Sequence, residues 1–211
     1  MDGQSAGPAG SAGATRTTRT TQTEDDVPTR GVHHLALTTE DMKATVEFYV
    51  GVLGMKLVHA MKVPEGIGTV NNRGNPPWER LRHYFFDMGG DSLYAFFEIP
   101  RGERPQTDRD AIGGMQHVAF ACSAERFQDI QDRLKAHGVP VDGPIEILPG
   151  IWSVYFHDNN DIRLEACCKL DEGDAQGVVE SVTQTKAEAA EELLTLGDND
   201  WIDTVAPNLK S

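Results

Sequence analysis

The chain has 211 residues, of which 39% are hydrophobic, which is enough for one well-buried core or for two small modules that share a core. Its formal net charge of -14 disfavours binding to nucleic acid, because contacts with phosphate groups require a basic surface. No apolar stretch approaches the roughly 18 residues that a membrane span requires, so we expect no membrane partner and a cytoplasmic location.

The two ends of the chain differ in composition from the middle. Residues 1–30 are rich in Gly, Ala, Thr and Gln and nearly lack large apolar side chains, so we expect a disordered tail. Residues 171–211 carry ten acidic residues against two lysines and form an acidic extension, in which residues 183–196 favour a helix. The folded domain is therefore expected over residues 31–170. Its three cysteines do not resemble a secreted disulfide framework, and we interpret them as reduced thiols.

The first half of this domain begins with a strand and a helix. Residues 31–38 alternate in polarity, which predicts a half-buried strand with His34 on one face. Thr39 can cap the following helix and Gly54 can end it. Apolar residues recur between them at helical spacing, at Val46, Tyr49, Val50 and Leu53. Three more strands are expected, over residues 57–61, 81–86 and 93–100. The Gly-, Asn- and Pro-rich loop over residues 62–80, with Trp78, is either a lid over a site or a surface insertion.

The same order of features returns in the second half of the domain. Residues 114–121 predict a strand, Ser123 can cap a helix, and Gly138 can end it. His34 and His117 lie 83 residues apart, and the two glycines that end the helices lie 84 apart. Three strands are again expected, over residues 139–141, 151–156 and 162–167. This repeat indicates a duplicated βαβββ unit, with modules over residues 31–101 and 114–170.

Four ionisable residues at matching positions of this repeat are candidates for a functional site. His34 and His117 lie on the first strand of each module, and we predict that Glu98 and Glu165 occupy equivalent places on the last strand, in apolar surroundings. A buried ionisable group requires a partner or a metal. Matching positions in a duplicated unit can converge on one site, and two imidazoles with carboxylates suit Fe(II), Mn, Ni, Co or Zn. We therefore predict a divalent-metal site made by these four residues.

Three segments of the chain resemble one known family. Residues 32–37 with residues 47–55 are similar to the opening of a vicinal-oxygen-chelate protein, residues 114–120 to the start of its second module, and residues 154–165 to its closing hairpin. The resemblance implies an α+β fold in which two βαβββ modules form a half-barrel. It also implies that His34, His117 and Glu165 are metal ligands, that the substrate is a small molecule with vicinal oxygens, and that a homodimer can form. The hairpin has Asp158-Asn159-Asn160-Asp161 where the family usually has Asp-Pro-x-Gly.

The reaction remains open between three classes. The first is an Fe(II) extradiol-type dioxygenase acting on a catechol-like substrate, because two histidines and a carboxylate leave room for substrate and O₂. Tyr155 resembles a tyrosine that orients or protonates a bound oxygen in such enzymes, and His157 shares its strand face and can act as an acid or base. The second is a glyoxalase-type lyase or epimerase working through a metal-stabilised enediolate, which Glu98 favours as a fourth ligand or as the base. The third is a metal-free small-molecule binding or resistance protein.

Two residues near the predicted ligands limit the substrates that a glyoxalase-type enzyme could use here. Glutathione-dependent glyoxalases carry Arg and Asn at positions that correspond here to Thr38 and Gly102, so we do not expect glutathione as the substrate. Another thiol or a CoA ester stays open as the substrate of a lyase. We rank the dioxygenase slightly above the lyase or isomerase, because Tyr155 supports it.

Overall fold

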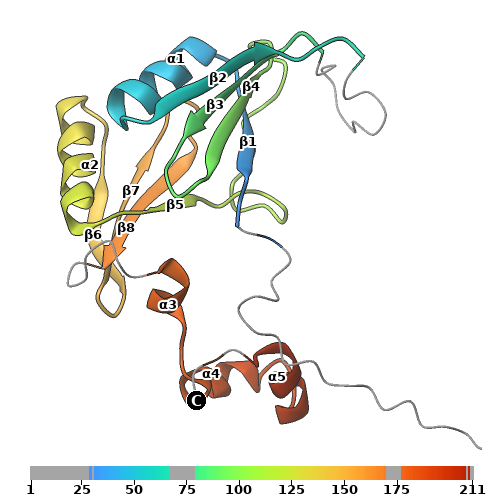
Figure 1. Ribbon diagram of the computed structural model, residues 1–211, viewed down its shortest axis with the longest axis vertical. Helices are drawn as coiled ribbons and strands as arrows, with labels where there is room; N and C mark the ends of the chain where they lie inside the picture. The colour runs from blue at the N-terminus through green and yellow to red at the C-terminus, as the bar shows by residue number, and fades with distance from the viewer. Residues whose placement is uncertain (1–28, 30, 67–78, 170–176, 208, 210–211) are drawn as a thin grey trace, which may run out of the picture. The chain divides into compact units, whose positions relative to one another are not determined.

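The computed structural model describes residues 29, 31–66, 79–169, 177–207 and 209 (Figure 1). It divides into two compact units, one over Thr29–Thr183 and the other containing Gln184–Ser211. The predicted tail up to residue 28 and most of the predicted loop, including Trp78, lie outside the described residues.

The first module has the predicted βαβββ order. It consists of β1 (His34–Thr39), α1 (Met42–Val46), the π-helix η2 (Glu47–Val52), β2 (Lys56–Lys62), β3 (Arg82–Asp87) and β4 (Leu93–Glu98). These strands form a sheet in the order β1-β4-β3-β2, in which β1 runs parallel to β4. The module is therefore a sheet with one helical segment inserted after its first strand.

Two local predictions for this helix are wrong. Asp41 caps α1 by accepting a hydrogen bond from the Ala44 amide, whereas Thr39 is the last residue of β1. The chain also winds as a π-helix after Val46, and the wider turn leaves Val50 38% exposed while Tyr49 is fully buried.

The second module repeats the first. It consists of β5 (Val118–Ala121), α2 (Ala124–Ala136), β6 (Asp142–Leu148), β7 (Ile151–His157) and β8 (Arg163–Lys169), in the sheet order β5-β8-β7-β6. Ser123 caps α2 as predicted, through a hydrogen bond from the Arg126 amide. The strand predicted over residues 139–141 is wrong, because Gly138 and Val139 close the helix with bonds to the carbonyls of Lys135 and Leu134.

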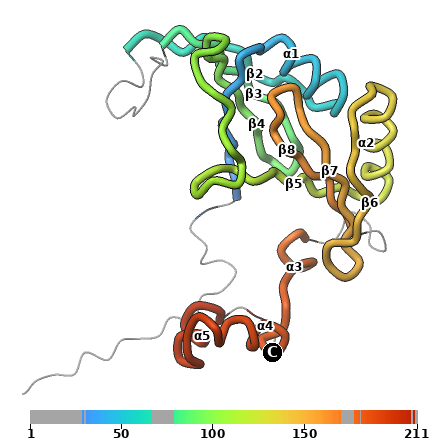
Figure 2. Tube along the Cα trace, turned by 180° about the vertical axis from the view of Figure 1, so that it is seen from behind, coloured from blue at the N-terminus to red at the C-terminus, as the bar shows by residue number. Residues whose placement is uncertain are grey.

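One hydrophobic core joins the two modules. Both sheets contribute large side chains to it from the faces that α1 and α2 cover, including Phe86, Tyr94, Phe96, Val154, Phe156 and Leu164. Figure 2 shows the two sheets and both helices from the opposite side. Because these faces share the core, the other face of each sheet points away from it; we call these the outer faces.

The C-terminal part contains three short helices among the described residues. Helix α3 (Val178–Val182) belongs to the larger unit, and α4 (Lys186–Leu193) and α5 (Asn199–Val205) belong to the other. Helix α4 lies within the predicted range of residues 183–196, and a capping box of Thr185 and Glu188 begins it. Within the described ranges, no helix is long and apolar enough to cross a bilayer.

Candidate metal centre

His117 and Glu165 are in contact on the outer face of the second sheet. Strand β5 pairs with β8 so that Ala119 lies opposite Glu165, and alternation places His117 on the same face. The Nε2 atom of His117 lies 2.9 Å from Oε2 of Glu165. Glu165 is only 6% exposed, and its second carboxylate oxygen accepts a hydrogen bond from the buried hydroxyl of Ser153. The carboxylate is thus held in place from behind while it faces the imidazole.

The hydrogen bonds around His117 indicate how its ring is oriented. Nδ1 faces the side-chain carbonyl oxygen of Gln116, which can only accept, so Nδ1 carries the proton and Nε2 has the lone pair in the neutral ring. A lone pair that faces a carboxylate is favourable only with a proton or a metal cation between the two groups. Two ligands that bind one metal at about 2.1 Å and a right angle lie about 3 Å apart, which is close to the observed contact. The pair therefore fits two neighbouring positions of a metal.

His34 lies on the outer face of the first sheet. It is exposed, its Nδ1 lies 2.9 Å from Nδ1 of His33, and its ring packs edge-on against Phe85 at 5.7 Å. His83 on the same face stacks on Phe97 at 3.6 Å. Burial lowers the pKa of His83, which favours a neutral ring there at neutral pH. This face therefore presents imidazoles and aromatic rings.

A single chain does not bring all the predicted ligands together. Among the residues that the structure describes, no group of three or more His, Cys, Asp or Glu side chains could hold a metal ion. The shared core lies between the core-facing sides of the two sheets. The outer faces, which carry His34 and His117, therefore point away from that core. The chain thus contains two separate parts of the predicted site, one with His34 and one with His117 and Glu165.

Glu98 does not occupy the position that we predicted for it. The pairing of β1 with β4 sets Glu98 opposite Thr39, on the face that turns toward the core, and sets Ala95 opposite Ala36, on the face of His34. Since Glu165 lies opposite the residue two places after His117, its counterpart in the first module is Ala95. The predicted equivalence of Glu98 and Glu165 is therefore wrong by three residues.

The carboxylate of Glu98 has a structural explanation. One oxygen accepts a hydrogen bond of 2.8 Å from the Met42 amide at the start of α1, and the other forms an ion pair with Arg82. An acidic group at a helix N-terminus is stabilised by the unpaired amides there. Glu98 therefore anchors α1 to β4.

Tyr155 lies beside the His117–Glu165 pair. It is opposite Glu165 in the pairing of β7 with β8, and its ring is perpendicular to that of His117 at 6.0 Å. Burial and the carboxylate of Glu165 raise the pKa of the Tyr155 phenol, so it keeps its proton at neutral pH. The phenol is thus placed to donate a proton or a hydrogen bond at this centre.

His157 lies two residues after Tyr155 and is the next residue on the same face of β7. It is exposed, is opposite Arg163 in the sheet, and its Nε2 lies 3.4 Å from Nη1 of Arg109. The structure therefore places His157 beside two arginines and not against the ligand pair.

Several residues around the centre were absent from the sequence prediction. Ser153 and Arg163 could have been found by alternation, because each lies two places from Tyr155 or Glu165 on a predicted strand. Gln116 precedes His117, yet nothing in its type indicated a role. Arg109 belongs to the connection between the modules, and no strand pattern places it.

The comparison with protein families decides the classification. Residues 31–165 match the family model of the Glyoxalase/Bleomycin resistance protein/Dioxygenase superfamily. The chain belongs to this superfamily. The fold predicted from the three resembling segments is confirmed, and superfamily membership supports a metal-dependent enzyme that modifies small molecules, or a resistance protein.

Two solved structures with TM-scores of 0.50 or above share the fold, and a third is similar at a lower score. A glyoxylase/bleomycin resistance protein/dioxygenase domain from Frankia sp. EAN1pec is 22% identical with a TM-score of 0.52, and the match covers 66% of this chain and 97% of that one. A glyoxalase family protein from Enterococcus faecalis is 19% identical with a TM-score of 0.50, over 65% and 97%. The fosfomycin resistance protein FosX from Listeria monocytogenes is 17% identical with a TM-score of 0.49, over 73% and 97%. Identities this low show the fold alone.

Proposed function

We propose that this chain is a divalent-metal-dependent enzyme whose metal ligands are His117 and Glu165 of one protomer and His34 of a second copy. The contact between His117 and Glu165 supplies two neighbouring ligand positions. Structural metal sites usually have four protein ligands and catalytic sites three, so a pair alone is incomplete. The exposed imidazole of His34 is the remaining ligand that the superfamily resemblance implies.

A two-fold dimer can complete the site twice. It would set the outer face of the first sheet of one copy against the outer face of the second sheet of the other, and symmetry would then make two equal sites. The small exposed residues Ala36 and Ala119 lie two positions from His34 and His117 on these faces and leave room for such an approach. The proposal therefore needs no rearrangement of the core that joins the two modules.

The leading reaction is that of an Fe(II) extradiol-type dioxygenase on a small catechol-like substrate. The observation that carries it is the position of Glu98 on the core-facing side of its sheet, which reduces the ligand set to two histidines and one carboxylate. This set is typical of non-heme Fe(II) oxygenases, in which the iron supplies open positions for a chelating substrate and O₂. Mn, Ni, Co and Zn remain alternatives for a different reaction.

The surrounding residues have definite tasks in this proposal. Gln116 orients the imidazole of His117, and Ser153 orients the carboxylate of Glu165. The protonated phenol of Tyr155 donates a hydrogen bond or a proton to the substrate. The glyoxalase-type lyase loses the feature that favoured it, because Glu98 is no longer available as a fourth ligand or as a base at this face.

Metal analysis is the first test. We expect close to one divalent metal per chain in protein loaded anaerobically, and a loss of most of it in both His34→Ala and His117→Ala, because each opens the ligand shell. His137→Ala is the matched control, since His137 is an exposed histidine at the end of α2. Metal content that is unchanged in His117→Ala would exclude this site, and a metal-free wild-type protein would favour the binding or resistance class.

Oxygen uptake separates the reaction classes. Fe(II)-loaded protein should consume O₂ with members of a catechol and hydroquinone panel, in step with loss of the substrate. Substrate conversion without oxygen consumption would instead favour the lyase or isomerase.

A further inference from the structure

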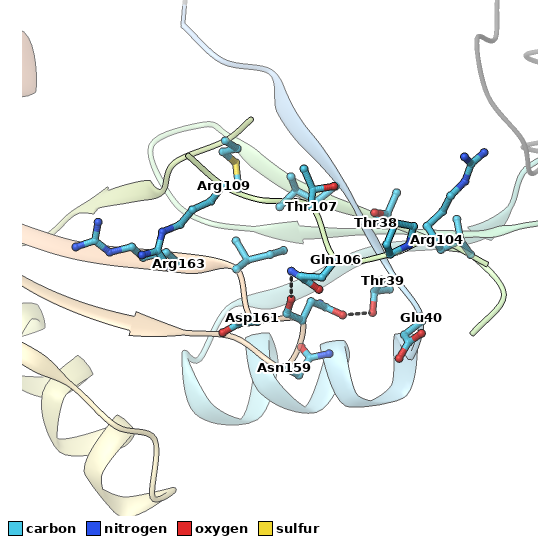
Figure 3. Close-up of a pocket in the computed structure, with 16 residues that line it drawn as sticks. Thr38, Thr39, Glu40, Arg104, Gln106, Thr107, Arg109, Asn159, Asp161 and Arg163 are labelled. Carbon is cyan, nitrogen blue, oxygen red and sulfur yellow. Dashed lines mark hydrogen bonds between the residues drawn. The ribbon is translucent and has the colours of Figure 1, made fainter. Parts of the chain in front are cut away.

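Arg163 and Arg109 lie together at one end of the candidate metal centre. Arg163 is on the same strand face as Glu165, two positions before it, and lies opposite His157 in the sheet. Arg109, from the connection between the modules, reaches the same His157 with its Nη1 at 3.4 Å. Figure 3 shows both arginines at one end of a pocket whose other end contains Glu40 and Arg104; the pocket has a volume of about 410 Å³, and His117 and Glu165 are not among its lining residues. Two guanidinium groups from distant parts of the chain thus flank one imidazole.

These two charges are weakly neutralised. The guanidinium of Arg163 lies 4.1 Å from the centre of the Tyr155 ring and donates a long bond of 3.4 Å to Gln116, and no carboxylate of the described residues forms an ion pair with it. Arg109 approaches Asp110 only at 3.7 Å, and that carboxylate is 62% exposed. In a chain with 33 acidic and 19 basic residues, Arg109 has one weak acidic partner and Arg163 has none among the described residues, so both are available for an external anion.

The spacing connects these arginines with the metal centre. Successive residues on one strand face are separated by about 7 Å, so Arg163 lies about that far from Glu165 along β8. This is the scale of a six-membered ring that carries chelating oxygens at one edge and an anionic substituent at the opposite edge. Arginine binds carboxylate and phosphoryl groups with paired hydrogen bonds, which gives orientation as well as affinity.

We propose that the substrate carries an anionic oxygen-bearing group, a carboxylate or a phosphoryl group, which Arg163 and Arg109 bind while its vicinal oxygens face His117 and Glu165. This inference rests on the proposed function and names the substrate class of the same site. Tyr155 is close to both groups of residues, because Arg163 lies over its ring and Glu165 lies opposite it in the sheet. By binding the anionic group, the arginines therefore fix the orientation of the substrate relative to the Tyr155 phenol.

Calorimetric binding of a matched pair of compounds tests the proposal. The probes are catechol and 3,4-dihydroxybenzoate, which differ by one carboxylate, measured against metal-loaded protein without oxygen. We expect 3,4-dihydroxybenzoate to bind about tenfold more tightly or better, since a hydrogen-bonded charge contributes this much. Arg163→Gln and Arg109→Gln should each lower the affinity for 3,4-dihydroxybenzoate more than the affinity for catechol, so that the preference for the carboxylate falls. Arg126→Gln, at an exposed arginine of α2, should change neither affinity.

Benzoate and phenylphosphonate, measured with metal-free protein, separate the two anionic groups and the two proposals. Binding of either one that is lost in Arg163→Gln supports the anion site whether or not the protein holds a metal, and the tighter of the two identifies the group. Equal affinities for catechol and 3,4-dihydroxybenzoate in metal-loaded protein would overturn the anion site while leaving the metal centre intact. An equal loss of both affinities in both arginine variants would likewise overturn it.

Discussion

At the scale of residues, Glu98 and Glu165 are both glutamates on the last strand of a module, but they lie on different sides of their sheets. Glu165 is buried on an outer face, where Ser153 holds one oxygen and His117 contacts the other. Glu98 is on the core-facing side, where a helix amide and Arg82 hold it. A carboxylate between apolar neighbours in sequence can therefore be a ligand or a helix anchor, and only its strand partners distinguish the two.

Glutamine substitutions at these two positions test this difference. We expect Glu98→Gln to leave metal content unchanged and to lower the free energy of unfolding by about 1 kcal/mol, because the half-exposed ion pair with Arg82 is lost while an oxygen remains for the Met42 amide. Glu165→Gln should lose most of the metal. Metal analysis and urea unfolding measure both effects, and a loss of metal in Glu98→Gln equal to that in Glu165→Gln would contradict the assignment of faces.

At the scale of elements, the turn between β7 and β8 connects the second module to the helix of the first. Tyr49 of η2 is fully buried and donates a hydrogen bond of 2.9 Å to Asp158. The same carboxylate accepts bonds from the amides of Asn160 and Ile162. Asp161 takes the left-handed conformation at φ 60°, which a glycine adopts more readily. The turn thus keeps its shape without the usual glycine and is positioned by contacts with the first module.

Removal of the Tyr49 hydroxyl should weaken this connection. We expect Tyr49→Phe to lower the free energy of unfolding at pH 7 by about 1–3 kcal/mol, because a buried carboxylate loses a donor. Burial already raises the pKa of Asp158 above its ordinary value, so its ionised form is disfavoured in the folded state and stability falls as pH rises through that pKa. The deficit of the variant should therefore be largest above this pKa and shrink as the pH approaches 3.8.

Urea unfolding at pH 7 and pH 4 measures this change. Tyr94→Phe is the matched control, because the buried Tyr94 hydroxyl has no hydrogen-bond partner among the described residues, and its removal should cost less. A deficit for Tyr49→Phe that is the same at both pH values would show that Asp158 is not responsible.

At the scale of the whole molecule, the shared core of the two modules separates the two parts of the site. The core-facing sides of both sheets meet, and so His34 on one outer face and His117 with Glu165 on the other do not form a three-ligand group among the described residues. A duplicated unit can place equivalent histidines about one axis either within a chain or between two chains. The observed core favours the arrangement between two chains.

Mixing two inactive variants tests this arrangement. His34→Ala and Glu165→Gln should each bind little metal alone, whereas a mixed dimer would contain one intact site, with His34 from one chain and the other two ligands from its partner. Random association after co-refolding should restore about one quarter of the wild-type metal content. A mixture that stays as low as the separate variants would mean that the ligands do not combine across chains.

Much of the architecture was determined by local features of the sequence. The strand alternation, the cap at Ser123, the stop at Gly138 and the 83-residue repeat of the histidines were enough to predict two βαβββ modules, and the observed element order confirms them. These features act over a few residues, so a single sequence shows them. Alternation is also a local pattern, so the sequence alone was sufficient to predict which face of its own strand His117 or Glu165 occupies.

Strand register and the packing of the two modules were decided only by tertiary structure. Which residue of β4 lies opposite Ala36 depends on hydrogen bonds between strands some 60 residues apart, and a shift of three residues moved Glu98 to the other face. Arg109 joined Arg163 and His157 because of the path of the connection between the modules, which has no periodicity to read. The sequence therefore determined the residue types and the modules, and long-range contacts determined which of those residues meet.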